Sequence, residues 1–371
     1  MIEFSTLAPL ALLGMETTDT VMVGTGAALL LLTLLLGWRI RRATPQAEVK
    51  APETPVVPPE TDRRREAHQY FHQAVEFEQQ QDLRSALDSY EKAIQADPVF
   101  IEALNNQALI LEDMGRYQEA LRNYDRVLQL QPDFFFSRFN QANCLRLLDR
   151  LEEALRNYDR ALATQPDHPT AWFCRGLTLA RLGRWESAVT SYDKALAYNP
   201  TDPQVWTHRA LALTRLEKLT EALSSYNKAL ELQPQAADLW ANQGTVLYRL
   251  GETMEAVNSF DRALELKPDL ALIWNTRGLA MADLGFTALA LQSHDRALAL
   301  DPNNAEAYFH KATCYALQGD GESALNHLRQ AVLLDPVALI PRLHNPCFQF
   351  LQEDPRFQEL SVSSVSGGEP S

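Results

Sequence analysis

The sequence predicts an all-α protein made of tandem helix pairs, with one transmembrane helix ahead of them. Three observations predict it: a period of 34 residues, small and large residues at helical spacing inside each period, and a run of 19 uncharged residues near the N-terminus. The composition agrees, because a chain of 371 residues with 46% hydrophobic residues can bury a large core and is not disordered throughout.

The uncharged run covers residues 20–38. As a helix it would span about 28 Å, close to the hydrocarbon thickness of a bilayer. Trp38 stands at its edge, and Arg39, Arg41 and Arg42 follow at once. An interfacial aromatic residue and a basic flank predict a single-pass membrane protein whose repeats lie on the cytoplasmic side.

The alternative interpretation of this run is a cleaved signal peptide, which requires a basic segment before it and a small-residue cleavage site after it. Here the basic residues come after the run and no A-x-A site follows, so we favour an uncleaved anchor. Gly24 and Ala28 form a small-xxx-small pair, which would let two anchors pack as a weak homodimer.

Two other segments surround this anchor. Residues 1–19 are a short N-terminal segment, and residues 39–66 are a basic collar that continues into a proline-rich linker. The whole chain carries 34 Lys+Arg against 48 Asp+Glu, a net charge of −14. This acidic balance argues against nucleic acid as the main partner, because binding a polyphosphate requires a concentrated basic surface.

The period is carried by eight prolines with equal spacings of 34 residues: Pro98, Pro132, Pro166, Pro200, Pro234, Pro268, Pro302 and Pro336. Placing each proline at position 32 of a unit divides residues 67–338 into eight units without an insertion. The units are 67–100, 101–134, 135–168, 169–202, 203–236, 237–270, 271–304 and 305–338. Position 20 is Ala in all of them, and position 8 is always Ala or Gly.

The spacing inside one unit predicts two antiparallel helices. Positions 4, 8 and 11 mark the buried stripe of a first helix, and positions 20, 24 and 27 that of a second. Glycine at position 15 of five units would end the first helix in a left-handed conformation, and the proline at position 32 would end the second. The small residues let the helices approach, while the large residues at positions 4 and 24 fill the space between units.

This pattern resembles the tetratricopeptide repeat over about three quarters of the chain, through an aromatic residue at position 4, small residues at 8, 20 and 27, an aromatic residue at 24 and proline at 32. The resemblance implies a right-handed α-solenoid superhelix of helix pairs, with the first helices lining a concave groove. A single unit cannot bury its own apolar face. We therefore expect residues 339–360 to cap the last unit, and residues 361–371 to form a disordered tail.

The groove would bind a peptide or protein segment through positions 2, 5, 6, 9, 12 and 13 of the first helices. The candidate contacts are Phe71, Asn106, Phe136, Phe139, Asn140, Phe173, Arg181, His208, Arg215, Asn242 and Arg249. Neighbouring phenylalanines would make an apolar patch, unless the rings pack between units. Three arginines in consecutive units would select an acidic or C-terminal segment, unless they pair with acids of the chain itself.

The second helices repeat an acid and a base at positions 25 and 26, for example Asp125–Arg126 and Asp261–Arg262. We interpret these pairs as solvent-exposed charges that contribute little stability each.

Two known modes of peptide binding in this family lack their residues here. No position 5 is Lys and no position 6 is Arg, so a clamp on a terminal carboxylate is not supported. The ladder of Asn at position 6 that holds a peptide backbone is broken, since only three units carry it.

No motif indicates catalysis, a cofactor or a metal site. The chain has no P-loop, GxSxG or GxGxxG, its four cysteines form no CxxC, and His68 and His72 are four residues apart with no evident third ligand. We therefore predict a non-enzymatic, membrane-anchored scaffold for protein–protein interaction. The alternatives are an assembly factor for a membrane protein complex and a regulatory subunit of a separate enzyme.

Overall fold

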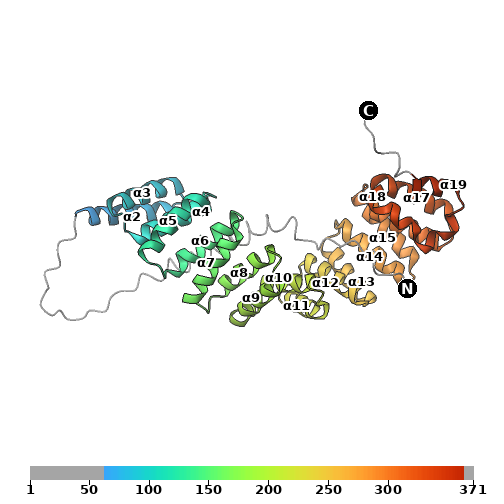
Figure 1. Ribbon diagram of the computed structural model, residues 1–371, viewed down its shortest axis with the longest axis horizontal. Helices are drawn as coiled ribbons and strands as arrows, with labels where there is room; N and C mark the ends of the chain where they lie inside the picture. The colour runs from blue at the N-terminus through green and yellow to red at the C-terminus, as the bar shows by residue number, and fades with distance from the viewer. Residues whose placement is uncertain (1–61, 363–371) are drawn as a thin grey trace, which may run out of the picture. The chain divides into compact units, whose positions relative to one another are not determined.

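The computed structural model describes residues 62–362 as a succession of helices (Figure 1). The sixteen longer helices that form pairs are α2 (Asp62–Gln79), α3 (Leu83–Ala96), α4 (Ile101–Asp113), α5 (Tyr117–Leu130), α6 (Phe135–Leu147), α7 (Leu151–Thr164), α8 (Pro169–Arg181), α9 (Trp185–Tyr198), α10 (Pro203–Arg215), α11 (Leu219–Leu232), α12 (Ala237–Leu250), α13 (Thr253–Leu266), α14 (Ala271–Asp283), α15 (Thr287–Leu300), α16 (Ala305–Leu317) and α17 (Gly321–Leu334). The shorter elements that follow are α18 (Pro336–Leu339), η3 (Ile340–His344), η4 (Pro346–Leu351) and α19 (Pro355–Val362).

The described chain divides into two compact bodies, which we call the N-terminal body (62–212) and the C-terminal body (213–362). The division falls inside α10. Successive helices pack against each other from α2 to α9 in the N-terminal body and from α11 to α18 in the C-terminal body, so the architecture is an all-α helical repeat solenoid (Figure 1). Each body is described by itself below.

Helix ends follow the predicted unit closely. From α4 onward, first helices begin at position 1 and second helices at position 17, where the sequence places the turns. The glycines at position 15 lie in the left-handed region, for example Gly251 at φ 82°, and this confirms the predicted helix ends. Three units place Gln81, Asp149 and Glu217 in the same conformation, with φ of 59–61°.

The core of each unit consists of the small and large residues that the pattern singles out. Position 20 is fully buried in every unit, from Ala86 to Ala324, and the tyrosines at position 24 are equally buried. The fit is tight. A methyl group added at Gly176 would clash with the Tyr192 ring of the same unit, so the second helix approaches the first at this glycine.

The C-terminal elements pack on the last helix pair. Leu343, Phe348, Leu351 and Phe357 are buried in one hydrophobic cluster with residues of α16 and α17, such as Phe309. Such side chains cover apolar surface that a further unit would otherwise bury.

The membrane prediction is not retained. In the part of the chain that the structure describes, no helix is long and apolar enough to cross a membrane. The longest of these helices, α2, has 18 residues but begins with Asp62 and three arginines, while the later helices have at most 14 residues, or about 21 Å. This contradicts the predicted localisation on a membrane with the repeats in the cytoplasm.

Several predicted segments lie outside the described residues. These are the N-terminal segment 1–19, the predicted span 20–38 with its Gly24–Ala28 pair, the linker up to residue 61, and the tail from residue 363. The linker also ends earlier than predicted, because α2 begins at Asp62. Residues 62–66 read DRRRE, which contains no proline and no glycine to prevent helix formation.

Candidate functional site

Position 5 of the first helices faces the protein core more than the sequence predicts. The rings of Phe71, Phe139 and Phe173 each lie 5.7–6.0 Å from the tyrosine at position 24 of the same unit. A helical wheel places position 5 on the open side of one helix, but the second helix of the unit reaches across and covers it. Phe139 is consequently only 7% exposed.

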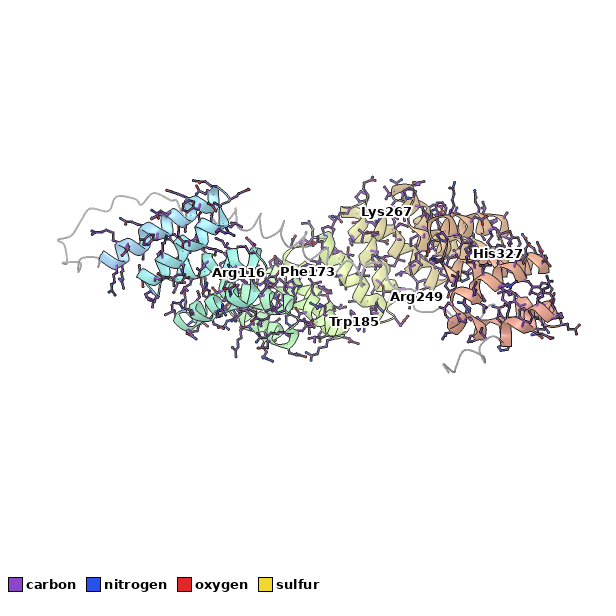
Figure 2. The ribbon with its side chains drawn as sticks, turned by 90° about the horizontal axis from the view of Figure 1, so that it is seen from above. Arg116, Phe173, Trp185, Arg249, Lys267 and His327 are labelled. Carbon is purple, nitrogen blue, oxygen red and sulfur yellow. The ribbon has the colours of Figure 1, made fainter. Side chains whose placement is uncertain are left out.

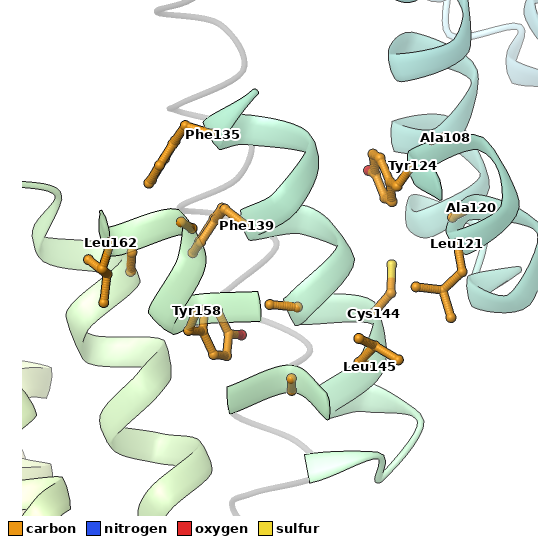
Figure 3. Close-up of a cluster of buried hydrophobic side chains, with 14 of the residues drawn as sticks. Ala108, Ala120, Leu121, Tyr124, Phe135, Phe139, Cys144, Leu145, Tyr158 and Leu162 are labelled. Carbon is orange, nitrogen blue, oxygen red and sulfur yellow. The ribbon is translucent and has the colours of Figure 1, made fainter. Parts of the chain in front are cut away.

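The three phenylalanines that the sequence places in one patch belong to two clusters. Phe139 stacks on Phe135 (Figure 3). Phe135 in turn meets Phe136 edge to face, with ring centroids 5.3 Å apart. Phe173, labelled in Figure 2, instead packs against His208 at 5.4 Å. It belongs to the cluster that contains Tyr192 and Leu179.

The polar candidates differ in how accessible they are. Asn106 is half-buried and its amide donates to the Tyr90 hydroxyl of the preceding unit at 3.2 Å. Asn140 and Asn242 are only 6% and 4% exposed. Of the candidate amides, Asn106 is therefore the one that a ligand reaches most easily.

The candidate arginines Arg181 and Arg249 hold acids of the chain. Arg181 donates from Nη2 to Asp149 Oδ1 at 2.7 Å and from Nη1 to the Arg146 carbonyl at 3.2 Å. Arg249 pairs in the same way with Glu217, and both acids occupy the left-handed position 15 of the preceding unit. Arg181 and Arg215 remain exposed, and Arg249 is half-buried.

A buried polar cluster lies between α4, α5 and α6. Glu112 is 7% exposed, and the Tyr124 hydroxyl donates to its Oε2 at 3.0 Å. Burial raises the pKa of the Glu112 carboxyl to about 7, while the bond from Tyr124 acts in the opposite direction. Tyr124 and Cys144 belong to the same hydrophobic cluster (Figure 3).

Sequence reasoning missed a ladder of hydrogen bonds and ion pairs between units. In it, the side chain at position 7 of one unit donates to the side chain at position 25 of the preceding unit. We call this the 7–25 ladder. Its members are Gln107–Glu91, Gln141–Asp125, Arg175–Asp159, Arg209–Asp193, Gln243–Asn227, Arg277–Asp261 and Lys311–Asp295. The position 25 acids therefore join neighbouring units and are more than solvent-exposed charges. The signal was available, because position 7 is Gln, Arg or Lys in every unit.

The tryptophans at position 4 make a bond that the aromatic pattern does not reveal. The indole N–H of Trp172, Trp206, Trp240 and Trp274 donates to the carbonyl of the proline six residues earlier, at 2.8–2.9 Å. This bond ties the first helix to the turn that precedes it. In the third unit position 4 is Arg138, and its guanidinium donates to the corresponding proline carbonyl, that of Pro132.

The described residues show little that favours nucleophilic or metal chemistry. No group of three or more His, Cys, Asp or Glu within residues 62–362 is arranged to hold a metal ion. Burial raises the pKa of the Cys314 and Cys347 thiols to about 11, which keeps both in the weakly nucleophilic thiol form.

Comparisons with known proteins agree with this geometry. Profiles of the tetratricopeptide repeat match residues 67–100, 101–134, 143–213, 207–271, 241–293 and 283–343. The chain belongs to the tetratricopeptide-repeat family. None of the curated proteins compared with it matches.

Solved structures with similar folds are also tetratricopeptide-repeat proteins. The C-terminal part of such a protein from Cytophaga hutchinsonii is 19% identical, with a TM-score of 0.55 over 62% of this chain and 95% of that one. A protein from Parabacteroides merdae is 21% identical, with a TM-score of 0.49 over 67% and 98%. YrrB, described as having an unusual peptide-binding site, is 24% identical, with a TM-score of 0.45 over 50% and 97%. At these identities the likeness shows the fold alone.

Proposed function

We propose that this tetratricopeptide-repeat protein is a protein-interaction scaffold that binds an extended peptide or protein segment along its first helices. The eight helix pairs of residues 67–338 are, in this proposal, eight repeats of a right-handed superhelix. The family is a widely shared binding platform, so the argument rests on the surface itself. The proposal contains no catalytic step.

The observation that carries it is a set of side chains on the first helices of the N-terminal body. Phe173 and His208 are half-buried and in contact with each other, and Arg181 is exposed at the end of the same helix as Phe173. Asn106 is also half-buried. Half-buried aromatic rings held in place by neighbours provide contact area at low entropic cost, and a fixed guanidinium can donate to a peptide carbonyl.

The partner on this surface need not be acidic. Arg181 and Arg249, which suggested acidity, already hold Asp149 and Glu217, so their positive charge is largely neutralised within the chain. We therefore expect recognition through aromatic contact and backbone hydrogen bonds.

The test selects peptides that bind the full-length chain from a displayed random library and then measures their affinity for variants. Phe173→Ala and His208→Ala should each lower the affinity for a selected peptide by about tenfold, or 1.4 kcal/mol. Thr190→Ala on α9, an exposed second-helix residue, serves as the control and should leave the affinity unchanged. Equal affinities for all three variants would contradict the proposal.

A further inference from the structure

A basic groove lies in the N-terminal body, on the side of the second helices. It has a volume of about 600 Å³ and is lined by residues of α5, α6 and α7. Its charged lining comprises Arg122, Arg138, Arg150, Arg156, Arg160, Asp125 and Glu153, a net charge of +3 in a chain that carries −14. Leu128 is half-buried and adds apolar surface from α5, whereas Leu121 and Leu145, labelled in Figure 3, are only 6% and 4% exposed.

Both carboxylates of the groove are already engaged inside it. Asp125 Oδ1 accepts from the Gln141 amide at 2.5 Å as part of the 7–25 ladder. Glu153 accepts two bonds from Arg150, at 2.7 and 2.8 Å. The two acids therefore have Gln141 and Arg150 as their hydrogen-bond partners, and Arg156 adds only a weaker electrostatic attraction to Glu153.

Three of those arginines have exposed side chains: Arg122, Arg156 and Arg160. Glu119 on α5 lies 3.5 Å from Arg122, but two shorter bonds from Arg116, at 2.7 and 2.8 Å, hold its carboxylate. Positive charge in the groove therefore stays accessible to a ligand.

At Arg138 a basic residue replaces the structural tryptophan that other units have. It stands at position 4, where four other units have a tryptophan, and its Nη2 makes the tryptophan's bond to the preceding proline carbonyl, at 2.5 Å from Pro132 O. Burial lowers the pKa of Arg138, and the nearby charge of Arg160 lowers it further. An anion bound in the groove would offset the repulsion between these two like charges.

The groove belongs to the second and third units alone. Both carry Arg at position 22, as Arg122 and Arg156. The other six units have Asp88, Thr190, Ser224, Asn258, Gln292 and Asn326 at this position. A general preference of the repeat for surface arginine does not explain such a local concentration.

We propose that this groove binds an acidic peptide segment, rich in Asp and Glu, in an extended conformation. Helices α5 and α7 have 14 residues each, or about 21 Å, which matches about six residues of extended chain. Guanidinium groups pair with carboxylates through two parallel bonds, and the half-buried Leu128 contacts the methylene groups of glutamate side chains. The proposal goes beyond the function proposed above, because it concerns the second-helix side of the molecule.

The experiment measures the anisotropy of a labelled peptide, Gly-(Glu)6-Gly, on addition of the full-length chain at low and physiological salt. Arg122→Gln/Arg156→Gln/Arg160→Gln should weaken binding by about tenfold or more. Lys194→Gln/Arg296→Gln/Arg329→Gln removes the same charge from exposed positions on α9, α15 and α17 and should change binding by less than about twofold. Arg138→Trp introduces the tryptophan that other units have at this position. The variant should therefore fold normally and still bind the glutamate peptide more weakly.

Other results would overturn the proposal. Equal losses in the groove triple variant and in the matched control would mean that the peptide senses only net charge. Equal binding of Gly-(Gln)6-Gly, or tighter binding of a single-stranded oligonucleotide, would exclude an acidic peptide as the preferred ligand. Phe173→Ala should leave the binding of the glutamate peptide unchanged. A negative result for this groove is therefore distinct from a negative result for the first-helix surface of the proposed function.

Discussion

At the scale of single residues, position 15 shows how tertiary contacts replace a local preference. Asp149 and Glu217 adopt a left-handed backbone that usually requires glycine, and their carboxylates pair with arginines at position 13 of the next unit. Gln81 is exposed and has the same conformation, with φ 61°, but position 13 of the unit after it is Asp113 rather than arginine. The ion pair that accompanies this backbone in the other two units therefore cannot form at Gln81.

Gln81→Gly should consequently stabilise the protein. Glycine removes the cost of the left-handed backbone, while the unfolded chain gains some entropy, so we expect a net gain of about 0.5–1 kcal/mol. Chemical denaturation of the full-length chain measures it. As a matched comparison, Asp149→Gly also loses the bond to Arg181 and should gain less. A loss of stability in Gln81→Gly would contradict this account of position 15.

Glu112 makes stability depend on pH. Its carboxyl has a pKa of about 7 in the folded protein, against 4.5 ordinarily, so the native state holds this proton more tightly than the unfolded chain. The stabilisation is complete below about pH 4.5 and is lost as the pH rises through 7. The variant Glu112→Gln lacks this titration. Between pH 5 and 8 the wild type should lose about 2–3 kcal/mol relative to it, as measured by urea unfolding. A difference that stays constant with pH would refute the assignment.

At the scale of helices, the 7–25 ladder sets how one unit sits on the next. Arg277 illustrates the arrangement. It donates to Asp261 of the preceding unit at 2.5 Å and to Ser293 of its own unit at 2.6 Å, and it lies over the Trp274 ring at 5.8 Å. One side chain therefore connects three helices, α13, α14 and α15.

A double-mutant cycle on Arg277→Met and Asp261→Ala measures this connection. The Arg277 side chain is 14% exposed, so we expect a coupling energy of about 1 kcal/mol. The pair Arg262–Glu265 on α13 is 42% and 64% exposed, and the same cycle there should give about 0.3 kcal/mol. Equal coupling in the two pairs would mean that the ladder is ordinary surface charge.

The close approach of helices at position 20 gives a second prediction at this scale. Ala188 on α9 is fully buried, and leucine there has no room, so Ala188→Leu should cost about 1–3 kcal/mol. Ala197→Leu on the exposed side of the same helix should change stability by less than about 0.5 kcal/mol. Thermal melts of both variants make the comparison, and an unchanged melt for Ala188→Leu would contradict the packing.

At the scale of the whole molecule, the fold was more predictable than the surface. The 34-residue period was enough to place the turns between helices, because the proline at position 32 recurs in all eight units and the glycine at position 15 in five of them. The exposure of position 5 was not predictable from one helix, since Phe139 is covered by Tyr158 of the second helix and by His168 in the turn after it. Likewise, Asp261 looks exposed on α13 until the next unit brings Arg277 to it.

The central claim is that a partner segment lies along the first helices. A photo-crosslinking residue at position 173, compared with one at position 190 on α9, tests it most directly once a peptide has been selected. We predict crosslinks from position 173 and none from position 190, with competition by the unlabelled peptide. Crosslinks from position 190 alone would contradict the claim and place the binding surface on the second helices.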